Sequence, residues 1–199
     1  MSKNSLLTEH LETFLNWGIH IPTATIIIEN EVNAEALEDF TKKLHFLEHL
    51  LSKGHSTIPA EITIKLNNCG GEVLAGMAIY DLIVNCDFDV KIIVEGEASS
   101  MGAIILQAAD TRQMLPSSII MIHDGERELS GHKRTVGAWN NLYNKMDERG
   151  KQILTERIQE KNENYKKGVL TRTLLFDTVY TAEEALETGL VDEILEPGV

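Results

Sequence analysis

Hydrophobic positions along the chain follow two spacings, one typical of buried strands and one typical of helices. Short, largely β-branched runs at 24–29, 62–67, 90–95 and 118–123 predict strands. After the first run, apolar residues recur at steps of three and four, a stripe typical of an amphipathic helix that Asn33 would cap. That stripe comprises Leu37, Phe40, Leu44, Leu47 and Leu51.

Further helices are predicted between and after the later strands. One covers about 73–83, after the break "NNCGGE", and another covers 102–108. Residues 134–166 are charged, with apolar positions scattered at roughly helical spacing. This long element has too few apolar positions for a core helix. We therefore expect it to protrude from the domain or to pack against another subunit. Thr181 and Glu184 form a predicted capping box for a last helix, which precedes the closing strand "LVDEIL".

The alternation of strands and helices predicts an α/β domain, because parallel strands need crossover helices between them. We expect residues 1–20 to form an N-terminal arm or a short helix and residues 21–199 to form a single domain. A hydrophobic content of 43% and a charged content of 25% are ordinary for a globular protein.

Charge and composition exclude several functional classes. The net charge of −13 argues against nucleic acid as the main partner, because phosphate binding needs clustered cations. No apolar run reaches the length of a membrane span, and Glu9, His10 and Glu12 interrupt the N-terminal apolar stretch, so we expect no signal peptide. Two cysteines are too few for a disulfide framework or a zinc site. We therefore expect a cytoplasmic protein without membrane attachment.

Candidate chemistry lies where three predicted strands end. Gly70 and Gly71 follow the strand 62–67, a serine pair follows 90–95, and a histidine ends 118–123. Each has an ordinary explanation as a tight turn, a helix cap or an edge residue. The carboxyl ends of parallel strands, however, share the edge of the sheet where α/β active sites gather. Acyl transfer uses a serine nucleophile, a histidine base and free backbone amides, and all three are available at this edge.

Four stretches together resemble the ClpP peptidase family: "NNCGGEVLAGMAIYDLI", "GEASSMGA", "LPSSIIMIHDG" and "TAEEALETGLVDEI". The resemblance covers roughly residues 24–195 and implies a ClpP/crotonase-like spiral of βαβ units with a protruding handle helix within 130–170. It also implies that Ser100, rather than Ser99, is the nucleophile. The general base is then His123, and the oxyanion amides belong to Gly71 and Met101.

The resemblance also implies where a substrate lies. Peptides in that family bind as an added strand beside a glycine-containing edge, with a second edge after the histidine. Here those edges are Gly70–Leu74 and Asp124–Glu128, so Gly70, Asp124 and Gly125 are predicted to bind substrate. The family's proline before the paired glycines is Cys69 in this chain.

The sequence does not determine which residue is the third member of the catalytic triad. Counting back without gaps from the last motif places the family's aspartate on Thr173, after a matching Arg172, and places Asp177 on a different acid. Three alternatives follow. A shifted loop brings Asp177 to the histidine, or a hydroxyl or carbonyl orients it instead, or the chain is a weakened or non-catalytic subunit.

Partners are likewise implied by the resemblance. Such subunits assemble into stacked heptameric rings, a tetradecamer, that enclose a chamber and receive polypeptide substrates from a separate AAA+ unfoldase. This chain contains no P-loop, so ATP would be hydrolysed by that partner. No metal or organic cofactor is implied.

Other functions remain open at this level. One is a phage-type maturation protease that works without an unfoldase. Another is a non-catalytic structural or regulatory subunit of a mixed ring. A third is an acyl-CoA enzyme of the crotonase type, against which the Ser100 and His123 motifs argue.

Overall fold

The computed structural model describes residues 17–54 and 57–196 of the 199-residue chain. The predicted N-terminal arm therefore lies outside the described residues, apart from its end at Trp17–His20. Within that end, β1 (Ile19–His20) is a short strand that pairs antiparallel with β2 (Thr25–Val32).

The sheet is mostly parallel, as predicted, and runs in the order β1-β2-β3-β4-β5-β8. The parallel strands along this path are β2 (Thr25–Val32), β3 (Ile62–Gly71), β4 (Val90–Ser99), β5 (Thr111–Met114) and β8 (Glu193–Ile194). Two further strands, β6 (Ile119–Ile122) and β7 (Thr178–Tyr180), lie off this path. β4 carries two neighbours on one edge, since its first half pairs with β5 and its end pairs with β6.

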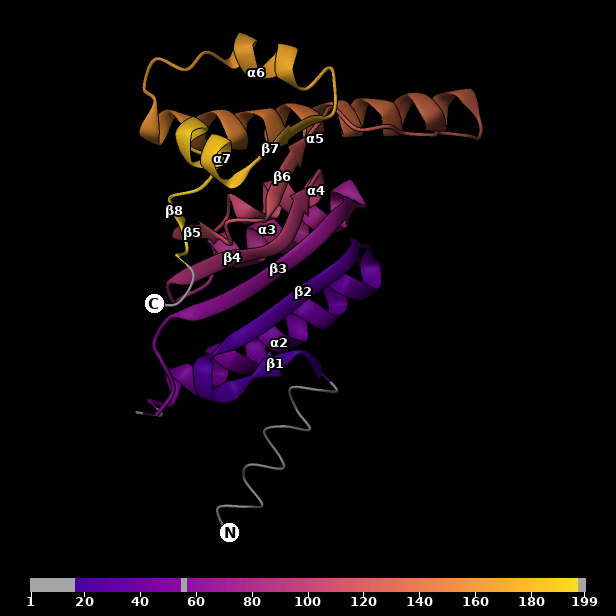
Figure 1. Ribbon diagram of the computed structural model, residues 1–199. Helices are drawn as coiled ribbons and strands as arrows, with labels where there is room; N and C mark the ends of the chain where they lie inside the picture. The colour runs from indigo at the N-terminus through magenta and orange to yellow at the C-terminus, as the bar shows by residue number, and fades with distance from the viewer. Residues whose placement is uncertain (1–16, 55–56, 197–199) are drawn as a thin grey trace.

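Helices cover the sheet and one end of the molecule (Figure 1). They are α2 (Ala34–Ser52), α3 (Val73–Val84), α4 (Met101–Leu106), α5 (Lys133–Lys161), α6 (Lys167–Thr173) and α7 (Ala182–Thr188), with a 3-10 turn at Ile21–Thr23. The Asn33 side chain accepts a hydrogen bond from the Ala36 amide and so caps α2 as predicted. The predicted capping box is also present, because Thr181 and Glu184 exchange hydrogen bonds at the start of α7.

The core lies between the helices and one face of the sheet. Side chains alternate along β3, so that Ile62, Ile64 and Leu66 point inward and are fully buried. On the opposite face, Lys65 pairs across the strands with Glu95. The sheet therefore has one apolar face and one polar face, and the chemistry of the site begins where the strands end.

Several elements differ from their predicted form. β3 continues through the stretch expected to be a break, and β5 and β7 were not predicted because they are short and carry polar residues. The antiparallel pairing of β6 with β7 is compatible with the expected sheet of mainly parallel strands.

The expectation that the long charged element stays out of the core is wrong for its second half. Ile153, Leu154 and Ile158 of α5 are buried, while its N-terminal half projects beyond the sheet (Figure 1). The helix also ends earlier than predicted, and α6 follows after a turn. Among the described residues, no helix is long and apolar enough to span a membrane.

Candidate active site

Strand register brings three side chains together at the end of the sheet. The last aligned pair of β4 and β6 is Ser99 with Met121, and the Ser100 amide donates a 2.8 Å hydrogen bond to the Met121 carbonyl. β6 and β7 pair antiparallel up to Ile122 with Thr178. The residues just beyond these pairings are therefore neighbours in space, although they come from distant parts of the chain.

Those neighbours are Ser100, His123 and Asp177, which form a continuous hydrogen-bonded relay. The Ser100 Oγ atom lies 2.9 Å from His123 Nε2, and Asp177 Oδ1 lies 2.9 Å from His123 Nδ1. A carboxylate only accepts hydrogen bonds, so Nδ1 donates to Asp177 and Nε2 is the ring nitrogen that faces the Ser100 hydroxyl. This is the geometry of a serine activated by an oriented histidine.

Ser100 has a strained backbone, with φ of 53° and ψ of −114°. Such a conformation costs a non-glycine residue about 1–3 kcal/mol and persists only where neighbours impose it. Ser99 remains on the strand, is buried, and donates a 2.6 Å hydrogen bond to Glu97 Oε2. The sharp turn thus aims Ser100, rather than Ser99, at the imidazole.

Asp177 lies on an exposed turn between α6 and β7. Its side chain is 74% exposed, whereas that of His123 is 23% exposed. Thr173, where the ungapped count put the family's aspartate, instead donates to the Val169 carbonyl within its own helix. Of the two positions considered from the sequence, the structure brings Asp177 to the histidine. Thr178, which the sequence reasoning missed, ties this turn together by donating to the Thr173 carbonyl at 3.0 Å.

Of the paired glycines, Gly70 lies against Ser100 and Gly71 lies against the backbone of Val32. Gly70 and Gly71 have positive φ angles of 97° and 141°. A Cβ on Gly70 would lie 2.8 Å from the Ser100 Cβ, and one on Gly71 would lie 2.1 Å from the Val32 carbonyl oxygen. Both positions therefore require glycine, for conformation and for space. Met101, the residue of the second predicted oxyanion amide, begins α4, where amides lack an intrahelical acceptor.

A cavity of about 80 Å³ opens beside the serine and histidine. Its walls are largely apolar, and charged groups stand at one side. The apolar residues are Val73, Met77, Met101, Ile104, Ile122, Met146, Leu154 and Leu174. The hollow is therefore lined mainly by groups that match an apolar side chain.

Residues 15–198 match the family model for Clp protease. The chain belongs to the Clp protease family. The resemblance of the sequence motifs to ClpP peptidases is thereby confirmed, and the α/β fold with a mostly parallel sheet is consistent with that family. Membership of the Clp protease family supports a peptidase function.

The segment after the histidine in this Clp protease family member is fastened to α5. Arg127 forms an ion pair with Asp147 and lies 5.4 Å from the centre of the Tyr143 ring. Asp124 donates its amide to the Leu174 carbonyl at 2.8 Å, and its carboxylate lies 3.1 Å from Lys151 Nζ. Asp124 and Gly125 both line the cavity, but this segment forms no strand of its own.

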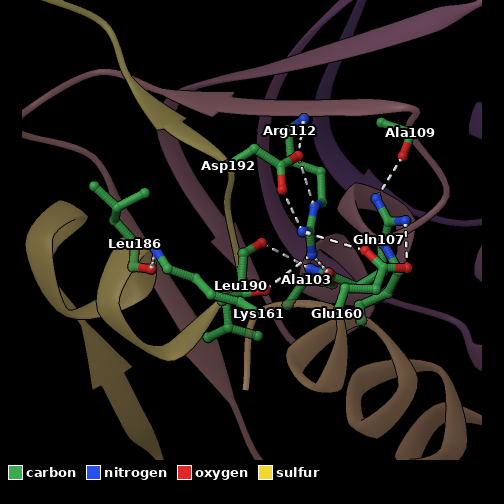
Figure 2. A network of polar contacts seen from close by, with 11 residues as sticks. Ala103, Gln107, Ala109, Arg112, Glu160, Lys161, Leu186, Leu190 and Asp192 are labelled. Carbon is green, nitrogen blue, oxygen red and sulfur yellow. Dashed lines mark hydrogen bonds and ion pairs between the residues drawn. The ribbon is translucent and has the colours of Figure 1, made fainter. Parts of the chain in front are cut away.

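A buried arginine joins the C-terminal part of this Clp protease family chain to the sheet (Figure 2). Arg112 is 1% exposed and donates to the Asp192 carboxylate, the Gln107 side chain and the Gly189 carbonyl. Burial alone would raise the pKa of Asp192, but the hydrogen bonds and charge of Arg112 lower that pKa below its usual value. The network ties the C-terminal end of α7, at Gly189, to β5.

Proposed function

We propose that this protein is a serine endopeptidase that cleaves polypeptides through an acyl-enzyme. The observation that supports this most directly is the hydrogen-bonded relay from Ser100 through His123 to Asp177. Membership of the Clp protease family supports the same reaction class. No metal or organic cofactor takes part in the proposed reaction.

In the first half of the reaction, Ser100 Oγ attacks the carbonyl carbon of a peptide bond while His123 Nε2 takes the hydroxyl proton. The developing oxyanion accepts hydrogen bonds from the Gly71 and Met101 amides. The C–N bond then breaks, and His123 returns the proton to the leaving amine. Asp177 keeps the imidazole in the required tautomer and stabilises its charged form.

In the second half, a water molecule takes the place of the leaving amine. His123 Nε2 accepts a proton from this water as its oxygen attacks the acyl carbon. The tetrahedral intermediate collapses, the ester bond to Ser100 breaks, and the proton returns to Ser100 Oγ. A free carboxyl product leaves, and the site is restored.

The substrate is proposed to lie as an extended peptide across Ser100. Gly70–Leu74 would provide one edge, and Asp124 and Gly125 the other, with one apolar side chain of the substrate in the cavity. The Asp124 amide is already bonded to Leu174, so we place the backbone contacts of that edge further along, from Gly125 onward.

Assembly into stacked heptameric rings and delivery of unfolded polypeptides by an AAA+ unfoldase are proposed from family membership. The projecting half of α5 supports the ring contact, because Trp139 is exposed there. Light scattering would test it: a chain that stays monomeric at all concentrations contradicts the ring. We keep the cytoplasmic location as a prediction.

The reaction is tested with the variant Ser100→Ala and the matched control Ser99→Ala. Cleavage of a fluorogenic peptide should fall by about 10⁴-fold or more in the first variant, because the nucleophile is lost. The second variant removes only the hydrogen bond to Glu97 and should retain activity within about threefold. Undiminished cleavage by Ser100→Ala would rule out the proposed reaction.

A further inference from the structure

Asn68 is a polar side chain buried beside the glycine turn. It occupies an inward position of β3, following Ile62, Ile64 and Leu66 on the same face, and is 1% exposed. A buried amide is tolerated when both its donor and its acceptor find partners. The partners of this amide therefore indicate why a polar residue occupies a position that alternation assigns to the core.

Its two hydrogen bonds join the glycine turn to the end of a neighbouring strand. Asn68 Oδ1 accepts from the Gly70 amide at 2.9 Å, and Asn68 Nδ2 donates to the Asn30 carbonyl at 2.5 Å. Asn30 is aligned with Asn68 in the β2–β3 ladder, and just beyond it the register of that ladder shifts. The side chain thus holds the irregular end of the sheet where Gly70 turns toward Ser100.

Asn68 also contacts the first turn of α4. A Cβ on Gly102 would lie 2.8 Å from the Asn68 carbonyl oxygen and 2.9 Å from its Oδ1, so a glycine is needed for this approach. The glycine turn also lies close to the start of α4, because a Cβ on Gly70 would lie 3.3 Å from the Met101 nitrogen. Asn68 therefore contacts both backbone segments that carry the proposed oxyanion amides.

We propose that Asn68 is a positioning residue for the oxyanion hole. By accepting the Gly70 amide, it fixes the peptide that links Cys69 to Gly70, and this in turn constrains the next peptide, which carries the proposed oxyanion amide of Gly71. The inference rests on the proposed peptidase function. Without the Asn68 side chain, the buried Gly70 amide loses its acceptor, and the turn relaxes to find another partner.

The effect is expected on the chemical step, since Asn68 itself touches no substrate. The variant Asn68→Ala should lower kcat about 10–100-fold and leave KM within about twofold. The reason is that a displaced Gly71 amide weakens the hydrogen bond to the oxyanion, and that bond forms mainly in the transition state. The affinity for a peptide boronate, whose tetrahedral adduct carries the equivalent oxygen, should fall by the same factor as kcat/KM.

Asn67→Ala is the matched control. Asn67 is the preceding residue on the same strand, and its Oδ1 accepts a 3.1 Å hydrogen bond from the Glu97 amide, away from the glycine turn. This control should keep kcat within about threefold. If Asn68→Ala keeps kcat within twofold of the wild type, or changes KM alone, the positioning role is overturned.

If Asn68→Ala does not fold, the variant Asn68→Asp tests the proposal instead. In Asn68→Asp the size is kept, and a protonated carboxyl offers the same acceptor to Gly70 and the same donor to Asn30. Because the carboxyl accepts from the Gly70 amide in either protonation state, kcat should stay within about threefold of the wild type, even where ionisation removes the bond to Asn30. A folded Asn68→Asp variant whose kcat falls by more than about tenfold overturns the proposal.

Failure of the inference is distinguishable from failure of the proposed function. A wild-type protein that neither cleaves peptides nor reacts with a fluorophosphonate at Ser100 contradicts the peptidase itself. A wild-type protein that does both, with an Asn68→Ala variant just as fast, contradicts only the role of Asn68.

Discussion

The two sides of the site are built in different ways. The nucleophile side, residues 68–71 and 98–102, lies at the ends of β3 and β4, where Asn68, Ala98 and Ser99 are almost fully buried. The acid side, residues 173–180, is a surface turn and a short strand on which Asp177 is largely exposed. His123 lies between the two sides and bonds to both.

The difference shows which forces hold each part of the relay. On the nucleophile side, close packing leaves no room for a Cβ at Gly70 or Gly71, so sterics fix the backbone. On the acid side, the β6–β7 register and single hydrogen bonds such as that of Thr178 determine where Asp177 lies. Substitutions on the nucleophile side should therefore cost more than comparable substitutions on the acid side.

The largest effect is expected for Gly71→Ala. The new Cβ would meet the Val32 carbonyl oxygen at 2.1 Å and its nitrogen at 2.8 Å, both backbone atoms. We expect a loss of more than about 10³-fold in kcat/KM and a loss of several kcal/mol in the free energy of unfolding. Peptide cleavage and urea unfolding would measure the two.

Gly131→Ala is the matched control for that prediction. Gly131 has a similar φ of 136°, and no atom in the described part of the chain lies within 4 Å of its added Cβ. It should lose about 1 kcal/mol from backbone strain alone, with little change in kcat/KM. If the two variants lost the same unfolding free energy, the close packing around Gly71 would add nothing to the cost of backbone strain.

The next largest effect is expected for Asp177→Asn, which keeps the shape but no longer fixes the tautomer of His123. We expect kcat to fall by about 10²–10³-fold, less than for a buried acid because water already screens this exposed carboxylate. Steady-state cleavage at neutral pH would measure it.

Thr173→Val is the companion variant, because the ungapped count considered that position for the acid. Its hydroxyl bonds within α6, so cleavage should stay within about threefold of the wild type. A larger loss for Thr173→Val than for Asp177→Asn would reverse the assignment.

A smaller effect is expected for Thr178→Val, which removes the hydrogen bond to the Thr173 carbonyl while keeping a β-branched side chain on β7. The turn that carries Asp177 should become looser, and kcat should fall about 3–10-fold. Thr178→Ser restores the hydroxyl and should recover most of the rate. A serine variant as slow as the valine variant would contradict the role of this hydrogen bond.

The smallest effect on activity, with a measurable effect on stability, is expected for Asp192→Asn. Asp192 is partly exposed but pairs with the buried Arg112, so its loss should cost about 1–2 kcal/mol at neutral pH, below the range for a fully buried pair. Activity should change by less than about twofold, since neither Asp192 nor Arg112 lines the cavity beside Ser100.

The pH dependence of that difference follows from the lowered pKa of Asp192. A depressed pKa in the folded state means that the stabilisation is present above the ordinary value of 3.8 and is lost as the pH falls through the lower folded value. The gap in unfolding free energy between the wild type and Asp192→Asn should therefore close below about pH 4. A gap that does not change with pH would contradict this account of the ion pair.

The nucleophile side could be predicted from the sequence to a large extent. Long β-branched runs marked β2, β3 and β4, and the glycine pair and serine pair that follow β3 and β4 marked the turn and the candidate serines, between which the ClpP resemblance selected Ser100. Asn68 was missed, although the alternation of Ile62, Ile64 and Leu66 marks its position as inward and a polar residue there is a signal.

The acid side could not be predicted in the same way. β7 spans only Thr178–Tyr180 and pairs antiparallel with β6, so neither its length nor an α/β pattern reveals it. The position of Asp177 depends on that pairing, which joins residues far apart in the chain. Counting along the sequence alone therefore left Thr173 and Asp177 as alternatives.

Labelling with a fluorophosphonate followed by peptide mass spectrometry tests the central claim most directly, because only a serine activated by a base reacts quickly with it. The account predicts one adduct, on Ser100, that forms much more slowly in Asp177→Asn. An adduct on Ser99, or no adduct on the folded wild-type protein, would contradict it.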